Sequence, residues 1–279
     1  IALMPVKLQH PGELNALAQL LEVLVAAVDD GRLAKAELVA SYQRIVALKQ
    51  QYPLLPQAKT QAAQLAQARS TLGKPEHRQH ELALAKAALT QVKPTQGPWP
   101  YQVGAVSKVL LIMPDQQKAQ ALAAALQHYS AKPLQISSIS LQHSDISSAA
   151  QQLASADLVI SGFIAPMQSL ADIGGMDDLT GIANIAAAYQ RQSQNYDALL
   201  PGITAAAAPH VFLSLRAPYD ISRYGQYADV VLASYAYNAA DNPSAIGAGN
   251  ATYEALAQAL LQQFMPKGRL PVTVAGYND

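Results

Sequence analysis

The sequence lacks cysteine and has few charged or aromatic residues, which make up 14% and 6% of the chain. Without cysteine it cannot form a disulfide, a catalytic thiolate or a cysteine-ligated zinc site, although cysteine-free chains occur on both sides of a membrane. Basic and acidic residues number 19 each, and no basic block of five or more occurs. We therefore expect no nucleic acid partner and no anionic membrane partner.

The sequence also lacks a run of about 18 apolar residues, the minimum for a membrane-spanning helix. The best candidate is interrupted by Asp29, Asp30 and Arg32. The chain starts at Ile1 within what resembles a strand already under way, so we expect any signal segment to lie upstream. This leaves a periplasmic, secreted, lipid-anchored or cytoplasmic location open. With 279 residues and 51% apolar content, the chain can bury a sizeable core in one large or two modest domains.

Motifs for common catalytic and nucleotide sites are missing. There is no GxSxG elbow, P-loop, HExxH or complete glycine fingerprint. Gly247 and Gly249 make only half of a dinucleotide fingerprint, and they do not directly follow a strand. We predict no cofactor.

The first hundred residues have a helical pattern. Leucine spacing predicts helices over 11–28 and 34–50, and alanine-rich segments predict two more over 58–72 and 76–92. His77 and His80 could share a metal on one helix face, but without a nearby third ligand we interpret them as solvated and predict no metal site. A proline- and glycine-rich linker follows over 94–104. We expect domains at 1–55, 56–104 and 105–279.

Beyond the linker, short apolar runs alternate with amphipathic helices. Strands are predicted at 108–113, 134–139, 157–163, 211–215 and 229–235, and helices at 115–129, 144–153 and 252–264. This alternation predicts an α/β fold with a doubly wound, mainly parallel sheet. Ligands of such sheets bind beyond the carboxyl ends of the strands.

Several loops at those strand ends carry candidate binding residues. Asp177 and Asp178 lie in a loop over 164–180, where they can bind a hydroxyl or a cation, or simply cap the next helix. Arg216 follows the strand at 211–215 and can contact a ligand or pair with a sheet-edge carboxylate. Tyr237 and Asn238 begin a small, polar loop that runs to residue 249.

Asp220 follows the same strand as Arg216, in the Pro-Tyr-Asp turn. It stands where a helix would begin, so we predict a role as N-cap.

Segments along nearly the whole chain resemble glycoside hydrolase family 3. The start IALMP, followed by AAVDDGRL and SYQRIVALKQQY, resembles the last strand and helices of the family's catalytic (β/α)8 barrel. FLSLRAPYDI, ADVVLASYAY and MPKGRLPVTV resemble its second, flavodoxin-like domain. The SLR-x-PYD form is most similar to the two-domain β-N-acetylglucosaminidase branch.

This resemblance implies the carboxyl-terminal portion of a retaining, exo-acting hydrolase of N-acetylglucosamine-containing saccharides. The family's nucleophilic aspartate, its histidine-bearing acid/base loop and its Lys-His motif belong to the barrel, upstream of a position equivalent to Ile1. No catalytic residue can be carried over, and Glu254 falls inside a predicted helix. We expect the chain to need a partner barrel and to hydrolyse nothing alone, while its domain packs beside the barrel and walls the substrate cleft.

Two alternatives remain. A stand-alone flavodoxin-like module would bind a small ligand at the strand ends without a barrel. An interaction scaffold would present an exposed apolar patch on residues 11–48, although a missing barrel would leave the same patch exposed.

Overall fold

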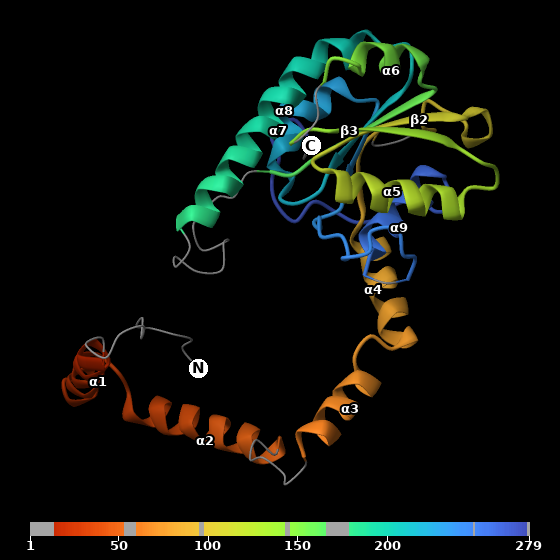
Figure 1. The fold of residues 1–279 in the computed structure, drawn as a ribbon. Coiled ribbons are helices and arrows are strands. Elements are labelled where there is room, and N and C mark those ends of the chain that lie inside the picture. The colour runs from red at the N-terminus through yellow and green to blue at the C-terminus, as the bar shows by residue number, and fades with distance from the viewer. Residues whose placement is uncertain are drawn as a thin grey trace. The chain divides into compact units, whose positions relative to one another are not determined.

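The structure is a computed structural model that describes residues 14–52, 60–94, 98–142, 146–165, 179–247 and 249–277, with only the backbone of residues 179–185. The chain divides into two compact units, Ile1–Ser70 and Thr71–Asp279. Described helices make up the first unit, and the second is an α/β domain (Figure 1). The three-part division at residues 55 and 104 stays a prediction.

The first unit contains the two predicted leucine-rich helices, α1 (Leu14–Asp29) and α2 (Lys35–Gln51). Between them the Asp30 carboxylate accepts hydrogen bonds from the backbone N–H and Nε–H of Arg32. Gly31 has a φ of +79°, which favours glycine. No residue of these two fully described helices is buried within the chain. Exposed apolar side chains from both helices line a cavity of about 570 Å³, including Leu21, Leu24, Val25, Leu38 and Tyr42.

Two further helices follow, α3 (Gln61–Thr71) and α4 (Pro75–Ala88), separated as expected at Gly73 and Pro75. Proline suits the first turn of α4, where its missing N–H costs no hydrogen bond. None of the helices in the described ranges combines the length and apolar character needed to cross a membrane.

The second unit is built on a six-stranded sheet with the order β1-β6-β5-β4-β2-β3. Strands β2 to β6 are parallel, and β1 runs antiparallel to β6 at the edge. The mainly parallel, doubly wound sheet predicted from the sequence is thereby confirmed. The strands are β1 (Thr90–Lys93), β2 (Lys108–Met113), β3 (Gln135–Ser140), β4 (Leu158–Phe163), β5 (His210–Ser214) and β6 (Val230–Ala233).

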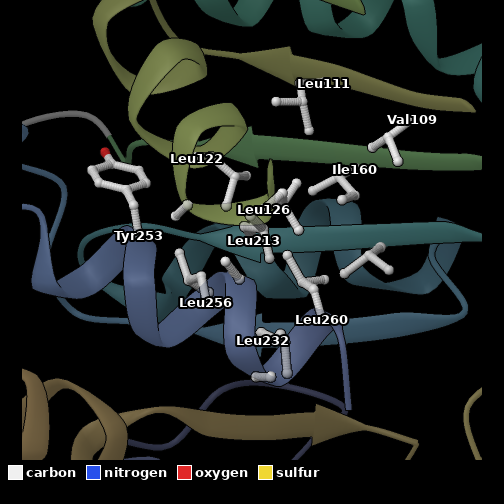
Figure 2. Packing of buried hydrophobic residues seen from close by; sticks show 14 of the residues in the cluster. Val109, Leu111, Leu122, Leu126, Ile160, Leu213, Leu232, Tyr253, Leu256 and Leu260 are labelled. Atoms are coloured by element: carbon white, nitrogen blue, oxygen red, sulfur yellow. The ribbon is translucent and has the colours of Figure 1, made fainter. Parts of the chain in front are cut away.

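Helices cover both faces of the sheet (Figure 1). One face packs against α5 (Gln116–Tyr129) and α9 (Ala251–Leu260), as Figure 2 shows for Leu122, Leu126 and Leu256 against Leu111 and Leu213. The other face packs against α6 (Ala149–Ser155), α7 (Leu179–Ala205) and α8 (Ile221–Tyr224). Alternate residues of each strand point to opposite faces, so the apolar runs of a doubly covered sheet are buried on both sides.

Two predicted helices differ from the structure in their ends, and one helix was expected without bounds. The predicted helix 76–92 ends at Ala88, and Thr90–Lys93 forms the edge strand β1, whose alternating burial is too short to stand out beside a helical pattern. The helix expected after residue 180 was given no bounds, and α7 occupies most of the segment up to residue 211, with Pro201 inside the helix. The predicted helix 252–264 ends at Leu260, and Gln262 takes a φ of +56°.

Candidate functional site

The carboxyl ends of β2, β4, β5 and β6 meet at one edge of the sheet. The strand order reverses between β2 and β4, because β3 lies beyond β2 while β5 and β6 lie beyond β4. Doubly wound sheets bind ligands at such a reversal, outside the carboxyl ends of the strands. This edge is therefore the candidate site.

Two cations and one aromatic ring lie together at this edge. The guanidinium of Arg216, after β5, lies 5.9 Å from the ring centroid of Tyr237, after β6. Nζ of Lys118, in the first turn of α5, lies 6.0 Å from the same ring. Both distances allow cation–π attraction, worth about 0.5–1 kcal/mol at exposed sites. The arrangement fixes a half-buried aromatic ring beside positive charge.

Lys118 is held in place by Asp115, the N-cap of α5. Oδ1 of Asp115 accepts a hydrogen bond from the Lys118 backbone N–H at 3.0 Å, and Oδ2 lies 2.5 Å from Nζ. The lysine is 8% exposed. A buried ammonium needs such a partner, because an unpaired charge away from water is costly. The charge pair was not predicted from the sequence.

The loop that carries Tyr237 is anchored from α9. Tyr253, fully buried, donates its hydroxyl hydrogen to the Tyr237 carbonyl at 2.8 Å. Oδ1 of Asn250 accepts from the Ala240 N–H at 2.9 Å, and its Nδ2 lies within hydrogen-bond distance of three loop carbonyls, those of Asn242, Pro243 and Ala245. Tyr235 has a φ of +57° where the loop leaves β6, which is unusual outside glycine. Buried side chains therefore hold this loop in place.

Asp220 differs from its predicted role as a helix cap. It stands at the N-cap position of α8, but its side chain makes no capping hydrogen bond. Instead Oδ1 accepts from the hydroxyl of Ser214 at 2.7 Å. Oδ2 is buried without a partner in the described part of the chain, and burial raises the pKa of this carboxyl to about 7. This burial could not be predicted from the sequence, because Pro-Tyr-Asp is typical of an exposed turn.

The predicted site residues are placed only in part. Arg216 and Tyr237 lie together, and the guanidinium is also 3.5 Å from the Ala165 carbonyl oxygen after β4. Asn238 is exposed on the same loop as Tyr237. Asp177 and Asp178 lie outside the described residues, so the alternative roles weighed for them stay predictions.

Sequence reasoning missed Lys118, Tyr253 and Asn250. Only Asn250 stands out in the sequence, because Asn250-Ala251-Thr252 has the form of a glycosylation sequon. Within the described ranges no three histidine, aspartate or glutamate side chains gather where they could hold a metal ion. His77 and His80 are both exposed on α4.

Comparison with known proteins points to one relative in particular. No protein-family model matches the chain. Beta-hexosaminidase A of Pseudoalteromonas piscicida is 41% identical over 274 residues, which are 98% of this chain and 44% of the relative. The chain therefore spans less than half the length of this curated relative.

Two solved structures share the fold. One is a fungal multi-domain β-N-acetylglucosaminidase of glycoside hydrolase family 3 with a GCN5-related glucosamine N-acetyltransferase region. Its TM-score is 0.50 and its sequence identity is 21%, and the match covers 92% of this chain and 26% of the fungal chain. The other is a β-glucosidase from Erythrobacter marinus, with a TM-score of 0.53 and 16% identity, over 90% of this chain and 36% of its own. The resemblance seen in the motifs is thereby confirmed: nearly the whole chain is similar to part of a β-hexosaminidase, and its fold is found in part of a β-N-acetylglucosaminidase of glycoside hydrolase family 3.

Proposed function

We propose that this chain is the carboxyl-terminal portion of a retaining, exo-acting β-N-acetylglucosaminidase and packs beside that enzyme's catalytic barrel. The observation that carries the proposal is 41% identity to Beta-hexosaminidase A over 98% of the chain, combined with a coverage of only 44% of the relative. The remainder of such an enzyme would hold the nucleophile and the acid/base group.

The carboxyl edge of the α/β domain would form one wall of the substrate cleft. Arg216 and Tyr237 support this role, because an aromatic ring beside a cation offers a sugar both a stacking face and hydrogen-bond donors. Asn238, Asp177 and Asp178 belong to the same predicted wall. The wall would position the saccharide, and the chemistry would take place on the barrel.

The exposed apolar side chains of α1 and α2 fit the same proposal. Leu21, Val25 and Tyr42 are 57%, 61% and 68% exposed, which is unusual for large apolar residues that share one cavity. In the proposed enzyme the rest of the barrel would cover them. An interaction scaffold would expose the same residues, so the patch alone does not distinguish the two functions.

A hybrid enzyme tests the proposal. This chain would replace the matching 44% of Beta-hexosaminidase A, and hydrolysis of p-nitrophenyl N-acetyl-β-glucosaminide would be measured for the hybrid and for the chain alone. We expect turnover by the hybrid only, with the β-anomer of N-acetylglucosamine as the first product seen by NMR. Turnover by the chain alone would overturn the assignment of the chemistry to the barrel, and a soluble but inactive hybrid would favour a stand-alone module or a scaffold.

The wall is tested in the same hybrid. Arg216→Ala and Tyr237→Ala should raise KM with a smaller change in kcat, because these residues would bind the substrate without reacting. Arg223→Ala is the matched control, since Arg223 is an exposed arginine that pairs with Asp197 away from this edge. Equal KM values for all three variants would remove the edge from the substrate cleft.

A further inference from the structure

A polar cavity lies at the opposite edge of the same sheet. It is bounded by the end of β1, the carboxyl end of α7 with the segment that follows, and the turn that leads into β6. Its volume is about 490 Å³, within the roughly 300–1,000 Å³ typical of small-molecule sites. The residues of the candidate site at the carboxyl edge do not line it.

Hydrogen-bond donors reach this cavity from two elements. Nζ of Lys93, at the end of β1, donates one hydrogen to the Ala228 carbonyl at 2.5 Å and keeps two N–H groups for a ligand. The hydroxyl of Tyr227 makes no hydrogen bond in the part of the chain that the structure describes, and this residue is 41% exposed. Tyr227 therefore offers both a polar group and a ring face.

Acceptors converge on the same space. Oδ2 of Asp229 accepts from the His210 backbone N–H at 2.9 Å, which leaves Oδ1 to accept from a ligand. The Gln226 side chain donates from Nε2 to the Arg223 carbonyl at 3.2 Å, which leaves Oε1 as an acceptor. The hydroxyl of Thr204 donates to the Leu200 carbonyl and can also accept.

The charges that face this cavity balance. Lys93 contributes one positive charge and Asp229 one negative charge. His210 is buried at the cavity wall, where burial lowers its pKa and keeps the ring neutral. The segment Ala206–Ala208 supplies only small side chains, so it leaves the space open. A lining with mixed donors, mixed acceptors and no net charge does not favour an anion or a cation.

We propose that this cavity binds a neutral, polyhydroxylated ring of the sugar class. Each hydroxyl of such a ring both donates and accepts, which matches two N–H groups, a phenol and free carboxylate and amide oxygens at one place. The exposed Tyr227 ring gives the apolar face of the sugar a surface on which to pack. This site is separate from the proposed cleft wall and does not depend on the proposed function.

The fluorescence of the single tryptophan can report ligand binding at this site. Trp99 is the single tryptophan of the chain, it is 7% exposed, and the next residue, Pro100, lines the cavity. Glucose and N-acetylglucosamine would be titrated into the 279-residue chain, with tryptophan fluorescence and calorimetry as parallel readouts. Glucosamine and glucuronate provide cationic and anionic derivatives of the same ring. We expect saturable binding of the neutral sugars and at least fivefold weaker binding of both charged ones.

Two tyrosines form a matched pair of variants. Tyr227→Ala should weaken binding about tenfold, which corresponds to roughly 1.4 kcal/mol. Tyr219→Ala should leave binding unchanged, because Tyr219 is 45% exposed at the other edge of the sheet. Equal binding by the two variants, equal binding of the charged sugars, or no heat and no fluorescence change at 100-fold molar excess (roughly millimolar sugar) would each overturn the proposal.

One further variant separates this site from the proposed cleft wall. Arg216→Ala is compared with Tyr227→Ala in the isolated chain, because Arg216 belongs to the proposed cleft wall and does not line this cavity. If that variant abolished binding while Tyr227→Ala had no effect, the sugar would occupy the carboxyl edge, which would overturn the second site and support the proposed wall. If the hybrid enzyme were inactive while sugar binding still depended on Tyr227, the proposed function would be overturned and this second site would be supported.

Discussion

The hydroxyl oxygen of Ser161 lies 2.7 Å from Nε2 of His210 at the centre of the sheet. It also lies 2.8 Å from the hydroxyl of Tyr196, and Nδ1 of His210 lies 3.0 Å from the Tyr227 carbonyl oxygen. The imidazole can therefore donate from Nδ1 and accept from Ser161 at Nε2, which makes it neutral. Ser161 and Tyr196 are fully buried, so a substrate cannot reach this serine and the network stabilises the fold.

The network predicts a loss of stability in mild acid. Burial lowers the pKa of His210, so the unfolded chain binds a proton more tightly than the folded protein. The contribution of His210 to stability is then fully present above its unfolded-state pKa of about 6.5 and falls as the pH drops below that value. Urea midpoints at pH 8 and pH 5.5 should differ less for His210→Gln than for the wild type. His128→Gln, at an exposed position, should keep the wild-type difference, and identical pH dependence in both variants would contradict the prediction.

For Asp220 we predict the opposite dependence of stability on pH. Burial raises the pKa of its carboxyl to about 7, so the folded protein favours the protonated form and loses stability as the pH rises from about 4 to about 7. Asp220→Asn should be more stable than the wild type above pH 7, by at most about 4 kcal/mol, since each pKa unit is worth about 1.4 kcal/mol. The gain should shrink towards pH 4 when urea unfolding is measured across this range. Asp241→Asn is the exposed control, and a gain that does not vary with pH would argue against a buried carboxylate.

The sequence predicted the parallel sheet because each buried strand is a short apolar run between turn residues, as in Lys108–Met113. It could not predict β1, because the pairing of Thr90 with Ala233 joins residues far apart in sequence. The same limit applies to the site. Arg216 was found because it ends an apolar run, whereas Lys118 looks like an ordinary helix lysine until Asp115 and Tyr237 are seen beside it. Patterns along the chain show strand ends, and only packing shows which of them meet.

Asn250 is expected to maintain the loop that carries Tyr237. Asn250→Asp keeps the shape of the side chain but replaces the donor that serves three loop carbonyls with a carboxylate oxygen. Each lost partner of a buried polar group costs about 1–3 kcal/mol. We expect a loss of roughly 2–4 kcal/mol in the free energy of unfolding and faster amide hydrogen exchange in residues 238–247. Asn242→Asp changes an exposed side chain of the same loop, and an equal effect there would assign the instability to added charge alone.

The tail segment MPKGRLPV requires glycine at position 268, because the backbone there lies close to another part of the chain. Its N–H donates to the Leu89 carbonyl at 3.0 Å, so the tail lies against the junction of α4 and β1. A Cβ atom at this position would lie 2.4 Å from both the Ala88 carbonyl oxygen and Thr90 Oγ1. Gly268→Ala therefore forces the tail away from the backbone of that junction. We expect a loss of about 1–3 kcal/mol in the free energy of unfolding and earlier proteolysis of the tail.

The matched control is Gly104→Ala, because a Cβ atom there meets nothing within 4 Å. Urea unfolding and limited proteolysis of the two variants would be compared side by side. A wild-type midpoint for Gly268→Ala would mean that the tail contributes little to the α/β domain. A lower midpoint with accelerated cleavage confined to the tail would show that the contact with Leu89 holds the carboxyl terminus onto the edge strand, since a general loss of stability would expose other segments as well.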